Sequence, residues 1–337
     1  MSRLFLALVV GAVLSCCRAQ DPPTPVPTPA LSPETTDGNT LCDFYNTMPA
    51  TGKAKLTNWC GSKSGTGSYV NGPCTGTAGA WLGVTCAVVS GSSRVTKLDT
   101  GGVGLNAIGG SLPSSIGGLD ALTYLYLWSI SLSGSIPSSI GGLTGLTSLY
   151  LTGNSLSGSI PSSMGALTAL VSLYLSENDL SGSIPSSLGG LTGLTDLGLM
   201  DNSLSGSIPS SMGGLTKLTY LGLFYNSLSG SIPSSMGALA TSTYLVLHSN
   251  ALTGPIPNSF CSLKRPGNLL VTNNPGLTCY PPCLSLNSYF DGGSFLSVCS
   301  GTFVTYPDTL ALTHPFARGA ATHTRTTSIL SLPLPPL

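Results

Sequence analysis

The sequence predicts a solenoid, in which short coils of chain stack into one elongated domain. The 337-residue chain repeats nearly the same sequence six times between Leu122 and Leu263, once every 24 residues, and a fixed period of this size is typical of solenoids. Aliphatic residues recur at the same positions of each repeat, which indicates a shared interior. Cysteines occur before the repeats and from the end of the last repeat onward, with none between Cys86 and Cys261, as expected if separate caps close the two ends.

Each repeat predicts one coil with its aliphatic side chains pointing inward. In the copy that begins at Leu146, the apolar positions are Leu146, Leu149, Leu151, Leu156, Ile160, Met164 and Leu167. The spacing from Leu149 to Leu151 places both side chains on one face of a short strand. Gly and Pro follow, so the chain must turn back on itself. Because one coil alone buries too little apolar surface to offset the entropy of ordering it, we expect the coils to stack.

An asparagine follows the predicted strand in five successive repeats, at Asn154, Asn178, Asn202, Asn226 and Asn250. An amide side chain donates and accepts hydrogen bonds, so a buried asparagine ladder would satisfy backbone groups of adjacent coils. The alternative is an exposed turn residue, but the strict period beside inward-pointing leucines favours the ladder. Ile130 takes this position in the first repeat and should interrupt the ladder. Ser242 replaces the leading leucine of the last full repeat, where we expect looser packing.

The two ends of the chain differ in composition from the repeats. Arg3, an apolar run from Leu4 to Leu14 and a small residue at Ala19 have the order of a secretory signal peptide. The sequence divides into a signal peptide (1–19), a Pro/Thr-rich linker (20–40), an N-terminal cap (41–93), the repeats (94–265), a C-terminal cap (266–300) and a disordered tail (301–337). The apolar run is too short for a membrane span, and no later segment is long enough, so we expect no transmembrane span.

Eight cysteines remain after removal of the signal peptide, four on each side of the repeats: Cys42, Cys60, Cys74 and Cys86, then Cys261, Cys279, Cys283 and Cys299. The end coils of a secreted solenoid need covers, and disulfides stabilise small covers in an oxidising compartment. Four cysteines allow three connectivities in each cap. We expect the local pairs Cys42–Cys60 and Cys74–Cys86 in front, and Cys261–Cys279 and Cys283–Cys299 behind. A zinc site at Cys279 and Cys283 is the alternative, but no histidine lies nearby.

The repeat follows the pattern LxxLxLxxNxLSGxIPxxMGxL, and its SGSIP block recurs at Ser157–Pro161, Ser181–Pro185, Ser205–Pro209 and Ser229–Pro233. It resembles the plant-type extracellular leucine-rich repeat of polygalacturonase-inhibiting proteins and receptor-kinase ectodomains. The segments Trp81–Cys86 and Arg94–Asp99 resemble the cap and first strand of that family. The resemblance covers Leu41 to Cys283. It implies an α/β solenoid: a right-handed leucine-rich-repeat superhelix of 24-residue coils with a concave parallel β-sheet and disulfide-stapled caps.

The first coil has two possible alignments. The strict period aligns Leu98 with the leading leucine of later repeats and Asn106 with the ladder. The family pattern instead points Val95 and Leu98 inward, with a short insertion at residues 106–109.

The repeats vary on one side only, and we interpret this side as the functional surface. Serines on the back of the coil are nearly constant, whereas the exposed residues of the strand differ from repeat to repeat. Selection for a ligand surface explains the contrast. The alternative is that turn hydrogen bonds keep the serines constant without any ligand. The candidate ligand-binding residues of the concave face are Tyr124, Tyr126, Trp128, Tyr150, Tyr174, Glu177, Asp196, Asp201, Tyr220, Phe224, Tyr225, Tyr244 and His248.

These candidates form three predicted groups. Tyr126, Tyr150 and Tyr174 should form a stacked column, because neighbouring strands lie about 4.8 Å apart. Seven further candidates form an acidic centre of Glu177, Asp196 and Asp201 and a second aromatic patch of Tyr220, Phe224, Tyr225 and Tyr244. Rigid aromatic rings with polar tips suit contacts with proteins and carbohydrates. Cross-strand aromatic pairs also stabilise a sheet without any ligand, and the two roles are compatible.

The sequence predicts a secreted binding protein, extracellular or at the cell wall or surface, whose concave face recognises an extracellular protein or glycan. Resemblance to polygalacturonase inhibitors implies a microbial wall-degrading enzyme as one example of a partner. One alternative is a structural or adhesive protein of the cell wall or surface. Another is ice binding by the regular coil backs. The chain has no G-x-S-x-G, H-E-x-x-H or phosphate-loop motif, so we expect no enzyme, no cofactor and no metal site.

Charge excludes one class of partner. Only 7% of the residues are charged, and loss of Arg3 and Arg18 with the signal peptide leaves 10 basic residues against 12 acidic ones. There is no basic stripe, so we expect no nucleic-acid partner. No sequence feature fixes the oligomeric state.

Overall fold

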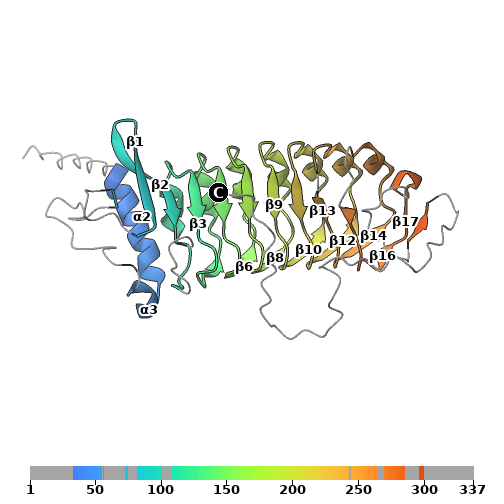
Figure 1. The fold of residues 1–337 in the computed structure, drawn as a ribbon. Coiled ribbons are helices and arrows are strands. Elements are labelled where there is room, and N and C mark those ends of the chain that lie inside the picture. The colour runs from blue at the N-terminus through green and yellow to red at the C-terminus, as the bar shows by residue number, and fades with distance from the viewer. Residues whose placement is uncertain are drawn as a thin grey trace, which may run out of the picture.

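The structure, a computed structural model, is an elongated stack of coils with a helix across one end (Figure 1). It describes residues 33–54, 56, 73–74, 82–100, 108–242, 244–263, 269–284 and 296–299. Most coils contribute one strand to a first, concave sheet, one strand to a second sheet and one short 3-10 helix. This is the leucine-rich-repeat solenoid that the sequence predicts.

The first sheet has nine strands, in the order β1-β2-β3-β5-β7-β9-β11-β13-β15. They are β1 (Val84–Val89), β2 (Ser92–Asp99), β3 (Tyr124–Tyr126), β5 (Ser148–Tyr150), β7 (Ser172–Tyr174), β9 (Asp196–Gly198), β11 (Tyr220–Gly222), β13 (Tyr244–Val246) and β15 (Leu269–Leu270). Only β1 and β2 are antiparallel; every later pair is parallel. The central leucine of each short strand faces the core, as Leu149 does, and pairs in register with Leu125 and Leu173 of the adjacent coils.

The register settles the alignment of the first coil. Leu98 pairs with Leu125, the central leucine of β3, and not with the leading leucine Leu122. Val95 and Leu98 are both fully buried, as the family pattern implies. Asn106 lies outside the described residues.

A second parallel sheet of seven strands lies on another side of the coils. Its strands are β4 (Ser133–Ser135), β6 (Ser155–Ser159), β8 (Asp179–Gly182), β10 (Ser203–Ser207), β12 (Ser227–Ser231), β14 (Ala251–Gly254) and β16 (Gly276–Leu277). The helices that follow are η1 (Ser114–Gly118), η2 (Ser138–Gly142), η3 (Ser162–Ala166), η4 (Ser186–Gly190), η5 (Ser210–Gly214), η6 (Ser234–Ala238) and η7 (Asn258–Ser262). The sequence did not predict this sheet, because Ser and Gly have low strand propensity and only stacking pairs these segments.

The asparagines join each coil to the preceding one. The Nδ2 of Asn178 donates to the carbonyl of Leu151 in the preceding coil at 3.0 Å and to that of Leu175 in its own coil at 3.1 Å. Its Oδ1 accepts from the amide of Leu156 at 3.0 Å. The same pattern recurs at Asn154, Asn202, Asn226, Asn250 and Asn274. Each amide therefore satisfies buried backbone groups in two coils at once.

The ends of the ladder differ from its middle. Asn274, beyond the five asparagines predicted from the sequence, extends the ladder by one coil. Ile130 is fully buried in place of an asparagine. The Oδ1 of Asn154 accepts a hydrogen bond from the Ile130 amide at 3.2 Å. Ser242, at the position of a leading leucine, is 4% exposed and its hydroxyl has no hydrogen-bond partner among the described residues. A buried polar group without a partner weakens this coil.

Turn hydrogen bonds account for one row of the constant serines. The Oγ atoms of Ser163, Ser187, Ser211, Ser235 and Ser259 each donate to a serine carbonyl of the preceding coil at 2.6–2.7 Å. Other serines on the back, such as Ser183 and Ser207, are exposed, and their hydroxyls bond to no residue in the described part of the chain. Hydrogen bonding explains why the serines of the Ser163 series are constant between repeats, but it does not explain the constancy of exposed serines such as Ser183 and Ser207.

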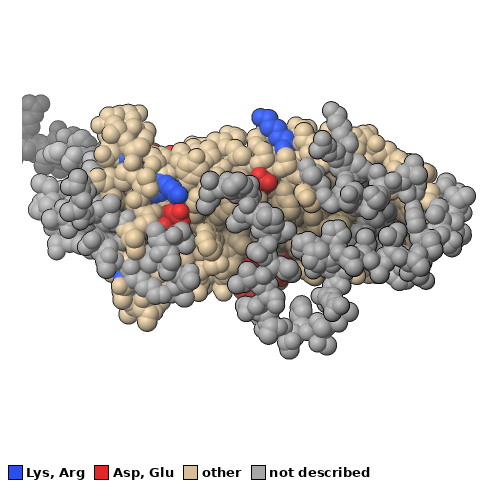
Figure 2. Space-filling view, viewed as in Figure 1, with Lys and Arg blue, Asp and Glu red and all other residues tan. Residues whose placement is uncertain are grey.

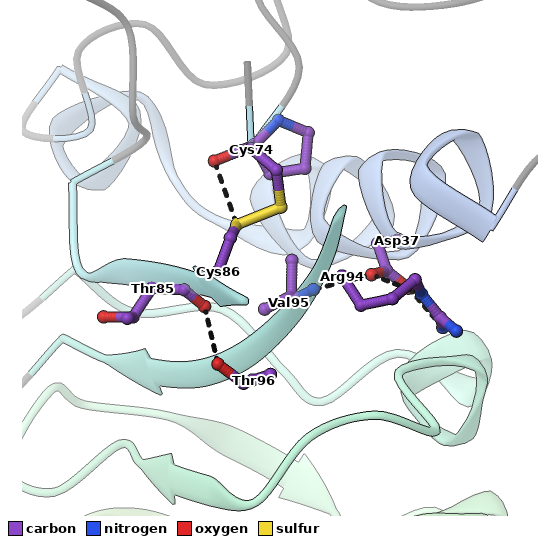
Figure 3. The surroundings of a disulfide bond; sticks show 8 residues. Asp37, Cys74, Thr85, Cys86, Arg94, Val95 and Thr96 are labelled. Carbon is purple, nitrogen blue, oxygen red and sulfur yellow. Dashed lines mark hydrogen bonds and ion pairs between the residues drawn. A yellow bond between two sulfur atoms is a disulfide. The ribbon is translucent and has the colours of Figure 1, made fainter. Parts of the chain in front are cut away.

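A helix and an ion pair close the N-terminal end. In α2 (Pro33–Thr47), Leu41 and Phe44 are fully buried. The buried carboxylate of Asp37 accepts from the Arg94 guanidinium at 2.9 and 3.0 Å and from the amide of Val95 at 2.8 Å (Figure 3). This carboxylate therefore ties α2 to β2, the first parallel strand of the sheet.

Helix α2 begins at Pro33, within the segment 20–40 that the sequence predicts as a Pro/Thr-rich linker. Its residues Asp37 and Leu41 are buried. Cys74 and Cys86 form the expected disulfide (Figure 3). Cys42 is also in a disulfide, but Cys60 lies outside the described residues and that pair stays a prediction. The signal peptide and the tail also lie outside them.

The C-terminal cap corrects the expected disulfides. Cys261 bonds to Cys283 and Cys279 bonds to Cys299, so both local pairs are wrong. Strand β17 (Cys279–Tyr280) pairs with β18 (Ser297–Val298), which brings Cys299 next to Cys279. Cys261 in η7 then meets Cys283 in η8 (Pro282–Leu284). Strand pairing, and not distance along the chain, decides the connectivity.

Of the helices that the structure describes, none has the length and hydrophobicity of a membrane span.

Replacing Asn178 with alanine should lower the free energy of unfolding by about 1–3 kcal/mol, because it leaves buried backbone groups of two coils unpaired. Chemical denaturation of the purified protein measures this change. Ser183→Ala is the matched control, since its exposed hydroxyl has no partner in the described chain, and it should change stability by less than about 0.5 kcal/mol. Equal losses for the two variants would show that the ladder contributes nothing specific.

Candidate functional site

Two rows of side chains project from the first sheet on its concave side. Residues of the first row are paired in register across the coils, namely Tyr124, Ser148, Ser172, Asp196, Tyr220 and Tyr244. The second row is Tyr126, Tyr150, Tyr174, Gly198, Gly222 and Val246. Alternation along each strand directs both rows away from the leucine core.

The second row carries a continuous column of tyrosines. The ring centroids of Tyr126 and Tyr150 lie 4.8 Å apart, and those of Tyr150 and Tyr174 lie 4.9 Å apart in a stacked pair. Tyr124 joins Tyr126 edge-on at 5.9 Å. Tyr220 continues the column, with its ring 6.5 Å from that of Tyr174 and nearly parallel to it. The predicted tyrosines are therefore in contact along the row, but Tyr126 meets Tyr150 edge-to-face, and the stacked rings are Tyr150, Tyr174 and Tyr220.

Two glycines make room for this column. A Cβ on Gly198 would lie 2.7 Å from the Tyr174 ring, and a Cβ on Gly222 would lie 2.5 Å from the Tyr220 hydroxyl. The rings thus lie over positions where any side chain would displace them. The Tyr220 hydroxyl donates to the Sδ of Met200 at 3.6 Å, which fixes the ring across two coils.

The second aromatic patch differs in membership from the sequence prediction. Phe224 stacks on His248 at 4.6 Å, and Tyr225 meets His248 edge-on at 5.3 Å. Burial lowers the pKa of His248, which favours the neutral ring in this stack. Tyr220 belongs to the tyrosine column instead, because Gly198 leaves it space to reach Tyr174. Tyr244 contacts no other aromatic ring within the described residues.

Several aromatic side chains of this face are open to solvent. Tyr124, Trp128, Tyr225 and Tyr244 are 42%, 43%, 56% and 47% exposed. Charged groups are sparse on the molecular surface, as Figure 2 shows for one side. Exposed aromatic area with little charge around it is typical of the centre of protein interfaces.

The predicted acidic centre divides into two sites. Asp196 opens β9, and its carboxylate accepts from the hydroxyl of Thr195 at 2.6 Å. Asp201 lies past the other end of β9, outside the strand. Glu177 has the same place one coil earlier, and burial followed by repulsion from Asp201 raises its pKa. Glu177 and Asp201 therefore form a pair that Asp196 does not join.

The pair lies in a strained part of the coil. Glu177, Asp201 and Tyr225 have φ values of 54°, 52° and 52°, and glycine takes the same place at Gly153 with φ 69°. A non-glycine residue in this left-handed region costs about 1–2 kcal/mol. The repeat pattern predicts that these residues are on the surface. It does not predict the left-handed backbone conformation that holds their side chains outward.

Asp196 places negative charge beside the tyrosine column. Burial raises the pKa of Tyr220 to about 12 and that of Tyr174 further, and Asp196 contributes to both increases. These phenols are neutral at physiological pH. Among the described residues, no group of three His, Cys, Asp or Glu side chains is placed to hold a metal ion. The face offers aromatic area and two separate acidic groups.

Comparison with known families identifies the repeat. The leucine-rich-repeat profile matches residues 120–180 and 169–228, and a second leucine-rich-repeat profile matches residues 243–263. The chain belongs to the leucine-rich-repeat family. No curated protein matches its sequence significantly.

Solved structures place it among plant leucine-rich-repeat proteins. The crystal structure of PEPR1–AtPEP1 is 33% identical with a TM-score of 0.61, over 73% of this chain and 32% of that one. The Arabidopsis receptor kinase HAESA ectodomain, in complex with a peptide hormone, is 30% identical with a TM-score of 0.52, over 74% and 45%. This leucine-rich-repeat chain therefore spans less than half the length of these receptors.

A structure of similar length also matches. The crystal structure of a plant ice-binding protein is 27% identical with a TM-score of 0.57, over 78% of this chain and 77% of that one. The leucine-rich-repeat fold and the disulfides of both caps indicate an extracellular protein.

Proposed function

We propose that this protein is a secreted binding protein whose concave sheet recognises an extracellular peptide or protein. The observation that carries the proposal is the tyrosine column from Tyr126 to Tyr220, which crosses five strands of the sheet. The structure of the HAESA ectodomain, a complex with a peptide hormone ligand, supports a peptide as the ligand. A glycan is the alternative ligand, since aromatic faces also pack on sugars.

Rigidity makes the column suitable for binding. Each ring is held by its neighbours, and Tyr174 and Tyr220 also lie over Gly198 and Gly222, so little conformational entropy remains to be lost when a partner binds. Tyrosines in this state are typical hot spots, with an apolar face for contact and a hydroxyl for hydrogen bonding.

Truncating Tyr150 or Tyr174 to alanine should weaken partner binding by about 2 kcal/mol or more, as for a typical hot spot. The measurement is capture of extracellular proteins and wall polysaccharides by the immobilised mature protein, followed by affinity determination for the captured partner. Ser186→Ala is the control, because its exposed side chain lies on η4, away from the concave sheet.

Melting temperatures must show that all variants fold. Normal binding by both tyrosine variants would contradict the proposal and favour a structural or adhesive role.

Ice binding is a second candidate, and the back of the coils favours it. Exposed serines without hydrogen-bond partners among the described residues recur there at the coil spacing, as at Ser159, Ser183 and Ser207. They line a shallow groove of about 900 Å³ with the Ile-Pro steps between them. The match to a plant ice-binding protein over most of both chains supports this candidate.

The ice-binding candidate predicts that the wild-type protein inhibits ice recrystallisation. Replacing Ser159, Ser183 and Ser207 together with lysine should abolish the inhibition, because long charged side chains break the regular hydroxyl surface. Tyr174→Ala should retain it. No inhibition by the wild type, or full inhibition by the lysine variant, would exclude this candidate.

A further inference from the structure

The first sheet contains a cation site that is occupied by a lysine of the same chain. Lys97 and Asp99 of β2 extend the first and second rows, beside Tyr124 and Tyr126 of β3. The Lys97 ammonium pairs with Asp99 at 3.2 Å and lies 5.2 Å from the centroid of the Tyr126 ring. A carboxylate and a tyrosine face thus hold one ammonium group at the start of the tyrosine column.

The same two elements recur at Asp196 without a cation. Asp196 lies in the first row, beside Tyr220 of the next coil and close to Tyr174 of the preceding coil. No Lys or Arg in the described part of the chain forms an ion pair with it. Thr195 and Thr219 donate to its two oxygens at 2.6 and 3.5 Å. A carboxylate offers about four acceptor positions, so this one can accept further donors.

A buried hydroxyl points toward the same place. Ser176 is fully buried, and its Oγ has no hydrogen-bond partner among the described residues. A Cβ on Gly198 would lie 2.9 Å from this Oγ, and the second row directs its side chains toward the concave side. Ser176 Oγ therefore lies beside Gly198, where the Tyr174 ring covers this glycine. A buried hydroxyl left without a partner is costly.

We propose that Asp196, Tyr174 and Tyr220 form a site for an arginine or lysine side chain of a basic peptide, with Ser176 at its base. The inference rests on the proposed function, because it names the chemistry of the ligand that the concave sheet binds. The internal Lys97 site shows that this sheet can hold a cation between a carboxylate and a tyrosine ring. At Asp196 the cation must come from outside the described chain.

The surroundings favour a basic peptide over an isolated cation. Glu177 and Asp201 repel each other on the same side of the solenoid, and neither forms an ion pair with a described residue. An extended chain with several positive charges neutralises both acidic sites while its backbone lies along the tyrosine column. A small free amine reaches only one site at a time.

The test is isothermal titration of the full mature protein with a tetra-arginine peptide and with the tetra-citrulline peptide, which has the same shape without the charge. The wild type should bind the arginine peptide about tenfold more tightly. Asp196→Asn should remove most of this preference, and Asp196→Glu should restore part of it. Asp179→Asn, which removes an equal charge from the exposed second-sheet strand β8, should leave the preference unchanged.

Equal affinity of the wild type for the two peptides overturns the inference without any variant. Equal losses in the Asp196→Asn and Asp179→Asn variants also overturn it, because they indicate a general charge effect. Spermidine binding as tight as the arginine peptide overturns the assignment to a peptide. If a captured partner depends on Tyr174 but not on Asp196, the proposed function stands and this inference fails. If it depends on neither, both fail.

Discussion

The structure depends on the hydrogen bonds of one amide side chain per coil. A coil of this length must turn several times, and each turn leaves backbone groups that cannot reach water. The asparagine side chain hydrogen-bonds to such groups in its own coil and in the preceding one, as Asn178 does with the backbone of Leu151, Leu156 and Leu175. It therefore makes the coils interdependent: one coil cannot be fully hydrogen-bonded unless its neighbour is in register. The aligned leucine columns and both parallel sheets follow from this register.

Because the ladder and the leucine core fix the coils, the residues on the two surfaces of the solenoid can differ from coil to coil. The interior and the turns admit few substitutions. The two rows of the concave sheet stabilise the fold only through contacts between neighbouring strands. Here they carry tyrosines over glycines, a carboxylate at Asp196 and a strained acidic pair at Glu177 and Asp201. The back keeps its serines, of which one row is hydrogen-bonded between coils and another faces solvent. The variable surface and the uniform surface therefore support different candidate functions.

Features with a period could be predicted from the sequence, and features set by contacts between unlike segments could not. The solenoid, the inward leucines, the asparagine ladder and the contacts between Tyr126, Tyr150 and Tyr174 all follow from the 24-residue repeat. The C-terminal disulfides depend on the pairing of β17 with β18, and the start of α2 depends on the fit of Asp37 to Arg94, which no periodicity reveals. Tyr220 contacts the tyrosine column and not the predicted second aromatic patch, because Gly198 has no side chain. The acidic centre divided because Asp196 and Asp201 lie at opposite ends of one strand.

Native-state hydrogen exchange tests the central role of the ladder most directly. The amides of Leu156, Leu180, Leu204 and Leu228 donate to asparagine side chains of the next coil. If the ladder makes the coils interdependent, these amides should exchange only through cooperative opening of several coils, with nearly equal free energies across the central repeats. Independent exchange of each coil, with these four amides no better protected than amides of the exposed turns, would contradict the account.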